Sequence, residues 1–295
     1  MSPFHSGELA VQRRTGQDRI AERVGRMIRA EIPAVAADFL VAQPMIVLGA
    51  ADPQGRVWAG QLAGPPGFVR AVDDETLCVD AEFAPGDPLR AALRAPARIG
   101  VIALEPQRRR RMRLNGRSAP VDGGLRIATD QVYSNCPKYI ARRRIESYDP
   151  SAVRYGSRTA ELDPAQQAAI AAADTFFVAS ADAAGNVDAS HRGGNPGFVQ
   201  VLSATRLRWP DYQGNSMFMT LGNLAVDPRC GLLIPDWSTG TVLQLTGTAE
   251  LNWDSGTFAR GSQCSIDFTV TGVVESRGPL RWGSPELSPV NPPVE

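Results

Sequence analysis

The sequence has few of the residues that bind metals or cross-link secreted proteins. Its 295 residues include four cysteines and two histidines. No two cysteines form a C-x-x-C pair, so a zinc site is not expected, and isolated cysteines are typical of thiols in a reducing compartment. We therefore expect no bound metal and a cytoplasmic location.

Net charge and long apolar runs are missing as well. The 31 basic and 31 acidic residues cancel, so no overall field attracts nucleic acid or an anionic membrane. No apolar stretch approaches the roughly 20 residues that span a bilayer, and residues 1–8 lack the basic and apolar regions of a signal peptide. The sequence thus predicts neither nucleic-acid nor membrane binding.

Lysine is nearly absent, because Lys138 stands alone among 31 basic residues. Arginine has evidently replaced lysine wherever either residue serves. A position that keeps lysine is one where a compact ammonium suits better than a planar guanidinium. Lys138 is therefore a candidate ligand-binding residue.

An internal repeat organises the chain. The offset in residue number between a stretch and its match is nearly constant and changes by a single residue along the chain. The matched stretches are 51–57 with 181–187, 66–69 with 196–199, 100–101 with 231–232, and 115–116 with 246–247. Pro33 and Pro164, which each open an alanine-rich segment, are related by the same spacing. Several matches in the same order indicate a duplicated unit.

Both copies predict the same series of elements. A helix opening at Pro is followed by an apolar strand and a D-x-x-G turn, which is a hairpin signal. The predicted strands are 45–50, 77–82, 99–104 and 111–115, then 176–181, 207–209, 231–235 and 241–251, with short helices at 89–94 and 221–226. Because short strands avoid exposed edges by closing into barrels, we predict a mainly β (α+β) fold of two tandem barrels with short flanking helices.

The limits of the copies divide the chain into five parts. An N-terminal arm or helix occupies 1–30, the first barrel 31–132, a linker 133–162, the second barrel 163–283 and a Pro-rich tail 284–295. Since the copies fold alike, positions where they differ in chemistry are the ones expected to carry function.

The second copy carries a polar, glycine-rich set that the first copy lacks. The set comprises Ser190, His191, Arg192 and Gly193 between the second and third strands, then Tyr212, Asn215 and Ser216, and finally Thr220 and Asn223 by the short helix. Hydroxyls, amides and an arginine near a helix start suit a phosphate, because backbone N–H groups there are unpaired. Tyr212 and Trp209 are suited to flank a flat ring. The alternative interpretation is a polar loop with no ligand.

Four motifs cover nearly the whole chain: FHSGEL at 4–9, YSNCPKYI at 133–140, SHRGG at 190–194, and the segment 214–224 with its GN and TLGNL ends. Together they resemble the FMN-binding split-barrel proteins related to pyridoxamine 5′-phosphate oxidase, in particular the branch with two copies in one chain. The resemblance implies FMN at the interface of two split barrels. It also implies that Ser190, Arg192 and Gly193 line the isoalloxazine and ribityl part, with Asn215, Ser216, Thr220 and Asn223 near the phosphate.

The sequence departs from the oxidase pattern at the phosphate. The oxidase has an Arg-Lys pair before its short helix, where this chain has Met219 and Thr220. Lys138 or an arginine of 142–144 is the candidate replacement. The oxidase's C-terminal substrate-binding segment has no counterpart, so the oxidation of pyridoxamine phosphate itself is not expected.

These observations predict an FMN-dependent oxidoreductase with a small-molecule substrate, which takes electrons from NAD(P)H or a separate reductase and can form a homodimer. His191 is the candidate proton donor, and Arg192 would stabilise negative charge on the reduced ring. Two alternatives stay open. One is a non-catalytic flavin- or haem-binding sensor or carrier, and the other is a barrel that has lost its cofactor.

Three further segments carry hypotheses. The basic run 108–117 is interpreted as a solvated hairpin, with phosphate or partner binding as the alternative, and only alternate residues of a strand can line one site. In the segment 135–139 we expect a loop that closes over the flavin through Lys138 and Tyr139, in preference to a nucleophilic Cys136. His5 either folds over the site or is a surface histidine.

Overall fold

The computed structural model describes residues 2–254 and 259–294 and holds two large sheets. The first sheet contains β1 (Met45–Ala51), β2 (Val57–Ala63), β3 (Val69–Ala71), β4 (Thr76–Val79), β5 (Ala97–Glu105), β6 (Arg110–Val121) and β7 (Gly124–Ser134). The second contains β10 (Thr175–Ala181), β11 (Val187–Gly193), β12 (Gln200–Ser203), β13 (Arg206–Tyr212), β14 (Arg229–Pro235), β15 (Thr241–Asn252) and β16 (Ser262–Arg277).

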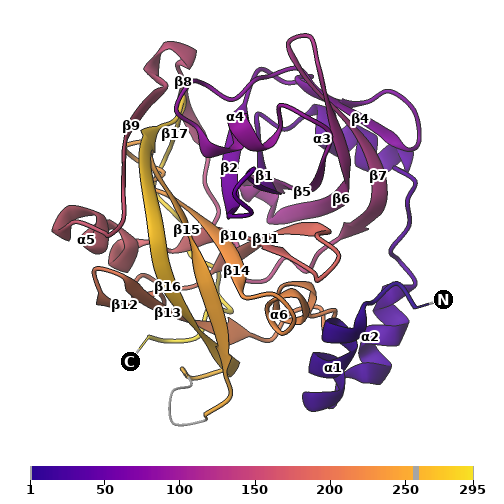
Figure 1. The fold of residues 1–295 in the computed structure, drawn as a ribbon, viewed down its shortest axis with the longest axis vertical. Coiled ribbons are helices and arrows are strands. Elements are labelled where there is room, and N and C mark those ends of the chain that lie inside the picture. The colour runs from indigo at the N-terminus through magenta and orange to yellow at the C-terminus, as the bar shows by residue number, and fades with distance from the viewer. Residues whose placement is uncertain (1, 255–258, 295) are drawn as a thin grey trace.

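The two sheets have the same topology. The first runs β2-β1-β5-β6-β7-β4-β3 and the second runs β11-β10-β14-β15-β16-β13-β12. Equivalent hairpins keep the same register, since Met45 pairs with Ala63 in one and Thr175 with Gly193 in the other. Figure 1 displays the first unit in purple to magenta and the second in rose, orange and yellow. The predicted mainly β fold of two tandem split-barrel units is confirmed.

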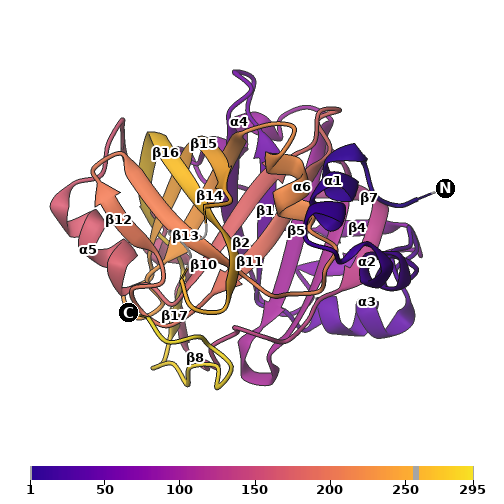
Figure 2. The same cartoon turned by 90° about the horizontal axis from the view of Figure 1, so that it is seen from below.

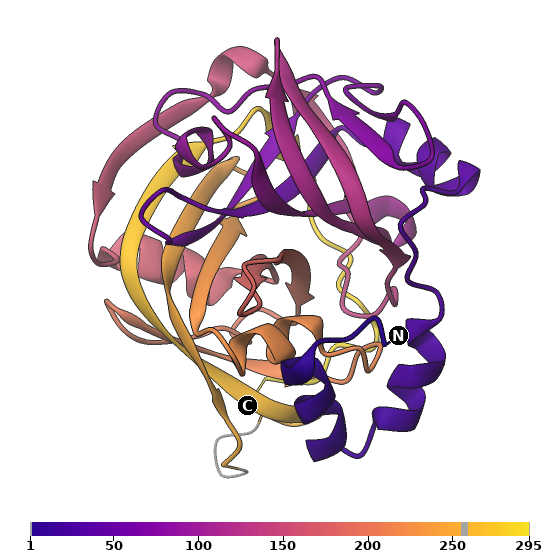
Figure 3. The same ribbon diagram turned by 45° about the vertical axis from the view of Figure 1, so that its right-hand side comes forward.

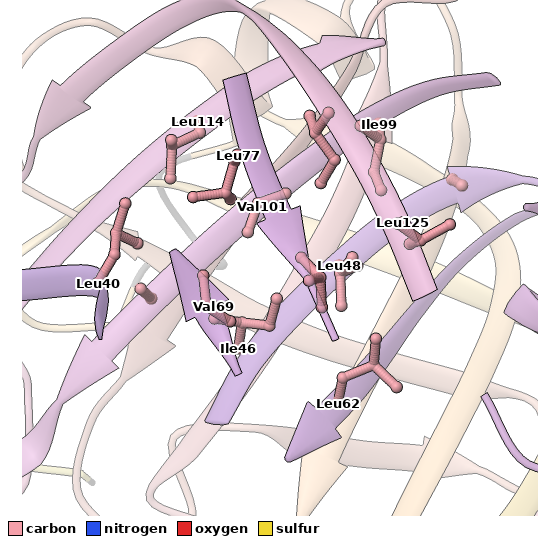
Figure 4. Close-up of a cluster of buried hydrophobic side chains, with 14 of the residues drawn as sticks. Leu40, Ile46, Leu48, Leu62, Val69, Leu77, Ile99, Val101, Leu114 and Leu125 are labelled. Atoms are coloured by element: carbon pink, nitrogen blue, oxygen red, sulfur yellow. The ribbon is translucent and has the colours of Figure 1, made fainter. Parts of the chain in front are cut away.

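Each unit encloses its own apolar core. In the first unit, Leu48 of β1, Val101 of β5 and Leu114 of β6 are fully buried and meet inside the sheet (Figure 4). In the second, Trp209 and Phe176 pack edge to face with ring centroids 5.3 Å apart. Burying a side chain of this size contributes about 1.5–3 kcal/mol, so these cores hold each unit together.

A third apolar cluster lies between the units, with Val47 and Ile102 from the first and Phe177 and Leu233 from the second. Two glycines permit the close approach. A Cβ on Gly100 would lie 2.6 Å from the backbone N of Ala189, and one on Gly231 would lie 2.6 Å from Cα of Trp58. No side chain fits at such distances, which explains why both copies have glycine there.

Helices cover the ends of the two sheets. They are α1 (Ser6–Arg14), α2 (Asp18–Gly25), α3 (Ala34–Val41), α4 (Pro88–Ala92), α5 (Pro164–Ala172) and α6 (Met219–Leu224), with short 3₁₀ turns at Pro106–Arg108 and Pro150–Ala152. The N-terminal signal predicted for α5 is present, because Asp163 accepts a hydrogen bond from the Gln166 N–H at 2.8 Å. Figure 3 displays α1 against α6, which brings the N-terminal arm to the second unit.

The segment between the units also forms strands. In it, β8 (Ile145–Tyr148) pairs with β17 (Leu280–Trp282), and β9 (Arg154–Thr159) pairs with β16. Figure 2 displays β8 and β17 together at the edge of the molecule. The segment expected to be a linker therefore adds a strand to the second sheet.

Several local predictions need correction. Residues 190–193 lie on β11 and not in a loop, and Asp211 and Tyr212 extend β13 beyond the predicted strand. The short helices occupy 88–92 and 219–224. Trp209 is a core residue and does not flank a ligand site. Among the described residues, none of the helices has the length and apolar character needed to cross a membrane.

Candidate functional site

A cavity of about 80 Å³ lies where the second unit meets the first. From the second unit it is lined by Ser190, His191, Arg192, Asp211, Tyr212, Gly214, Asn215, Ser216, Phe218, Met219, Thr220 and Leu221, and from the first by Ile102, Arg111, Arg113 and Asn135. Seven of the predicted site residues thus meet around one space, on β11, β13 and α6 and in the segment between the last two.

Three other predicted residues lie outside this lining, within the part of the chain that the structure describes. Gly193 ends β11 under the backbone of Tyr139, where a Cβ would lie 2.0 Å from the Tyr139 carbonyl oxygen. Asn223 lies on α6 and faces the N-terminal arm. Lys138 belongs to the half-buried segment beside Tyr139.

The first unit supplies a cation that reaches across the interface. Nη1 of Arg111 lies 2.6 Å from Nδ1 of His191. A guanidinium can only donate, so Nδ1 accepts and the proton of the neutral imidazole is on Nε2. Nε2 is buried and has no hydrogen-bond partner among the described residues. His191, a residue of the cavity lining, therefore holds a buried N–H group that has no acceptor among the described residues.

The charges around His191 keep it neutral. Burial, and after it the guanidiniums of Arg111 and Arg192, hold the pKa of His191 well below 6.5. Burial and the neighbouring Arg113 also lower the pKa of Arg111, to about 9. The Nε of Arg111 is buried without a partner among the described residues. Arg111 is therefore a cation that an anion in the cavity would stabilise.

Arg113 lies two positions further along β6 and points the same way. It forms an ion pair with Asp188, donates to the Ala189 carbonyl at 2.9 Å, and contacts the Ser190 hydroxyl. Burial opposes the charge of Arg113, but Asp188 outweighs burial and the pKa of Arg113 is raised. The Ser190 hydroxyl lies 2.8 Å from that of Thr220, so a guanidinium and two hydroxyls form one polar cluster.

Arg192 completes the positive wall. Its Nη1 lies 2.5 Å from Oδ1 of Asp211, while its buried Nε has no partner among the described residues. Burial raises the pKa of Asp211 and Arg192 opposes that rise. Three arginines and one aspartate line the cavity, so its net charge favours an anion.

The segment after β7 borders the cavity through Asn135, and Tyr139 of the same segment packs against the cavity residue Tyr212. The Tyr139 ring packs on that of Tyr212 with centroids 5.3 Å apart, and its hydroxyl donates to the Gln213 carbonyl at 3.0 Å. Burial, with Tyr139 nearby, raises the pKa of Tyr212 to about 12. Tyr139 has a φ of 65°, a left-handed conformation that is uncommon outside glycine. Cys136 lies half-buried in this segment and does not appear in the cavity lining.

The N-terminal motif docks on α6. His5 caps α1 by accepting from the Gly7 N–H at 3.1 Å, and its Nε2 donates to Oδ1 of Asn223 at 2.9 Å. The helices nearly touch, since a Cβ on Gly222 would lie 2.6 Å from the backbone of Glu8. His5 is thus a structural residue that holds α6, and neither a lid nor a free surface histidine.

A larger cavity of about 540 Å³ adjoins the first. The two share Arg111 and Asn135, and the larger one continues over Phe39, Tyr133 and Pro137. Ligand pockets commonly measure about 300–1,000 Å³, so this space is large enough for an organic molecule beside the arginine wall.

Arg111 and Arg113 were not singled out from the sequence, although the basic run that contains them was. Their signal is the spacing of two on a strand, which puts both on one face. Two of the cations proposed from the sequence have partners elsewhere, because Arg143 pairs with Asp174 and Arg142 with Glu286.

Comparison with known proteins addresses the second unit. Residues 162–274 match the family model described as pyridoxamine 5′-phosphate oxidase. The second unit therefore belongs to the pyridoxamine 5′-phosphate oxidase-like split-barrel family. No protein in a search of curated sequences matches the chain.

Several solved structures resemble part of this chain. A pyridoxamine 5′-phosphate oxidase-like protein of Lactobacillus delbrueckii is 17% identical, with 39% of this chain and 94% of that chain covered and a TM-score of 0.33. The haem storage protein HutZ of Vibrio cholerae is 16% identical, with 40% and 96% covered and a TM-score of 0.29. An FAD-binding protein of Mesorhizobium loti is 12% identical, with 43% and 99% covered and a TM-score of 0.28.

Proposed function

We propose that this protein is an FMN-dependent oxidoreductase with one FMN site per chain, in the arginine-lined cavity between the units. The observation that carries the proposal is the contact between Arg111 and His191, which presents an uncompensated cation and a free Nε2–H to one space. FMN carries a phosphate and a ring with several acceptor atoms, and both match such a wall. The reducing, cytoplasmic setting expected from the sequence fits the four free cysteines.

Different residues of the chain would contact the phosphate and the ring of FMN. Arg113, Ser190 and Thr220 form the cluster suited to the phosphate, in place of the missing Arg-Lys pair. Arg111, His191 and Arg192 would face the ring, where FMN supplies the electron chemistry when bound. Asn215 and Ser216 line the same cavity. Lys138 would approach only through movement of its own segment.

Binding requires the site to open. At about 80 Å³ the cavity is smaller than the roughly 300 Å³ at which ligand pockets begin. The segment after β7, which contains Tyr139, is the wall suited to move, because it connects two strands and its residue Asn135 lines the cavity. This extends the expectation of a loop that closes over the flavin.

The substrate and the electron donor are part of the same proposal. The adjoining 540 Å³ cavity suits a small organic substrate or the nicotinamide of NAD(P)H, with a separate reductase as the other source of electrons. His191 is neutral, so it would act as a hydrogen-bond donor through Nε2 and not as a charged acid. We also infer that the two units arose by duplication and that a homodimer, if formed, uses another surface.

A haem-binding module is the second candidate, because His191 is a neutral imidazole facing a cavity. A haem iron needs an imidazole nitrogen without a proton. Arg111 occupies Nδ1 as a donor, which leaves the proton on Nε2. Haem would therefore require the Arg111 contact to break, and this favours FMN.

The visible spectrum of the purified protein tests the proposal. We expect two flavin bands, or their appearance after incubation with FMN, and anaerobic bleaching by NADH or NADPH. Bleaching only after addition of a reductase would assign the electron donor to a separate protein. A Soret band would support the haem candidate, and a colourless protein that FMN cannot reconstitute would contradict both.

A further inference from the structure

A second cavity, of about 250 Å³, lies at the equivalent place on the other side of the interface. The second unit contributes Leu233, Val242 and Gln244 to it, and these are the repeat counterparts of the residues Ile102, Arg111 and Arg113 that line the first cavity. The first unit contributes Gln61, which is the repeat counterpart of His191. The two cavities are thus built from matching positions with exchanged roles of the units.

Hydrogen bonds support this equivalence. Nε of Arg113 donates to the carbonyl of Ala189 at 2.9 Å, and Nε2 of Gln244 donates to the carbonyl of Ala59 at 3.0 Å. Ala59 and Ala189 occupy equivalent positions of the repeat and are both fully buried. The same cross-interface contact is therefore made twice, once by a cation and once by a neutral amide.

The chemistry of the second cavity is reversed. Where the first has arginine and histidine, the second has Val242, Gln244, Leu62 and Gln61. The carboxyl group of Asp87, a residue that is 5% exposed, also lines it. Arg277 and Glu82 also line this cavity and carry opposite charges. The positions equivalent to Arg111, Arg113 and Arg192 are neutral and a carboxyl group is buried in the wall, so this cavity does not match an anion such as FMN.

Buried acceptors face the second cavity. Gln244 is 1% exposed, and its Oε1 has no hydrogen-bond partner among the described residues. Leaving such a buried acceptor unpaired is unfavourable, so a donor that reaches it is favoured. Asp87 accepts from the Leu89 N–H at 2.7 Å and from the Tyr155 hydroxyl at 2.6 Å. Burial raises the pKa of Asp87 to about 6, which leaves it mainly ionised at pH 7.5.

The connecting segment forms part of the wall. Tyr155, on β9, lines the cavity and reaches Asp87 past Gly86, where a Cβ would lie 2.7 Å from that of Tyr155. The first cavity has Asn135, from the segment after β7, in its wall, and the second has Tyr155. Even with Tyr155 in place, the space of 250 Å³ exceeds that of the first cavity.

We infer that this second cavity binds a small uncharged or cationic molecule with N–H donors, such as a primary amide or amidine, at the Oε1 of Gln244. This site is separate from the flavin site, since none of the residues that form it lines the first cavity. One chain would then bind an anionic cofactor at one cavity and an amide- or amidine-bearing ligand at its counterpart.

Three probes of nearly the same shape test the inference by calorimetry on the full-length protein at pH 7.5. Benzamide offers neutral N–H donors, benzamidine offers cationic ones, and benzoate offers an anion without donors. We expect benzamide and benzamidine to bind with a Kd at least tenfold lower than that of benzoate. Equal affinity for benzoate, or no binding of any probe, would overturn the inference.

Substitutions at Gln244 test whether the probes bind at the second cavity. Gln244→Leu should weaken benzamide binding at least tenfold, while Gln200→Leu, the same change at an exposed position of β12, should leave it unchanged. If Gln244→Leu fails to fold, Gln244→Glu serves instead, because it keeps an acceptor and adds negative charge. Gln244→Glu should shift the preference toward benzamidine over benzamide at least fivefold. Unchanged affinity in a folded Gln244→Leu protein, or an unchanged preference in Gln244→Glu, contradicts binding at this cavity.

Discussion

Arg111 of the first unit donates a hydrogen bond to Nδ1 of His191 in the second unit, over a distance of 2.6 Å. This contact fixes the tautomer of the imidazole and holds an uncompensated guanidinium in a buried place. It also makes the candidate site depend on both units, because neither barrel alone contains the pair.

Replacing Arg111 tests whether its charge serves the ligand. Arg111→Met keeps much of the side-chain volume and removes a charged donor whose hydrogen bond to an anionic group contributes about 1.5–3 kcal/mol. We expect the Kd for FMN, measured by quenching of flavin fluorescence, to rise at least tenfold. The ligand-free protein should melt at a higher temperature, because an unpaired buried charge is gone.

Arg117→Met is the matched control on the same strand. Arg117 is exposed and pairs with Asp130 at 3.2 Å on the surface, where an ion pair contributes little. The Kd for FMN and the melting temperature should both stay close to those of the unchanged protein. An equal loss of affinity in both variants would argue against a specific role for Arg111.

The protonation state of His191 is open to direct measurement, since the chain has two histidines. In a sample labelled with ¹⁵N-histidine, we expect His191 to keep its proton on Nε2 and not to titrate between pH 6 and 8. The physical reason is the low pKa that burial and Arg111 impose. In Arg111→Met the tautomer preference should weaken, and a midpoint near pH 6.5 in the unchanged protein would disprove the assignment.

Glu8 predicts a pH dependence of stability. Burial raises its pKa from 4.5 to about 8, with Asp188 and Asp182 adding to the rise and Arg113 and the His5 backbone opposing it. The folded state therefore holds a proton that the unfolded state loses above pH 4.5. Stability from this group is complete below pH 4.5 and falls as the pH rises to 8, by up to roughly 5 kcal/mol.

Glu8→Gln removes this titration but keeps an acceptor for the His5 N–H. In urea titrations, we expect the variant to gain stability over the unchanged protein as the pH rises from 5 to 8. The two proteins should converge below pH 4.5, where Glu8 is protonated in both the folded and the unfolded state. A difference that does not vary with pH would show that Glu8 is ionised in the folded protein.

The contact between α1 and α6 gives a prediction about packing. A Cβ on Gly222 would meet the Glu8 backbone at 2.6 Å, whereas one on Gly214 would have no heavy atom within 4 Å. We expect Gly222→Ala to lower the free energy of unfolding by about 1–3 kcal/mol, as overpacking does. Gly214→Ala should change it by less than about 1 kcal/mol. Equal effects would mean that α1 does not depend on this close contact.

The repeat in the sequence predicted the tandem fold because residues that match between the two copies are ones that the fold requires at equivalent places. Gly100 and Gly231 are required where each barrel touches the other, so both copies retain them. The strands β7 and β16 were not predicted, although segments such as S-I-D-F-T-V in β16 alternate polar and apolar residues. That alternation is a strand signal, so the sequence does carry a pattern that indicates β16.

The sequence predicted only the residues that the second unit contributes to the candidate site. Comparison of the copies pointed to Ser190, Arg192 and Thr220, which line the cavity. Arg111 and Arg113 belong to the other copy, and only the packing of two barrels brings them within reach. No local pattern encodes that distance, so the neighbours of His191 could not be deduced from its own segment. The place of Lys138 depends likewise on the path of an irregular segment.

Arg113 and Gln244 occupy equivalent positions of the two copies, and this has a consequence for the evolution of the protein. In a symmetric dimer of identical barrels, every mutation alters both interface cavities together. With both barrels on one chain, a codon change at position 113 leaves position 244 untouched. Selection can then act on each cavity separately. The amide of Gln244 and the guanidinium of Arg113 are two side chains that have diverged at equivalent positions of the two copies.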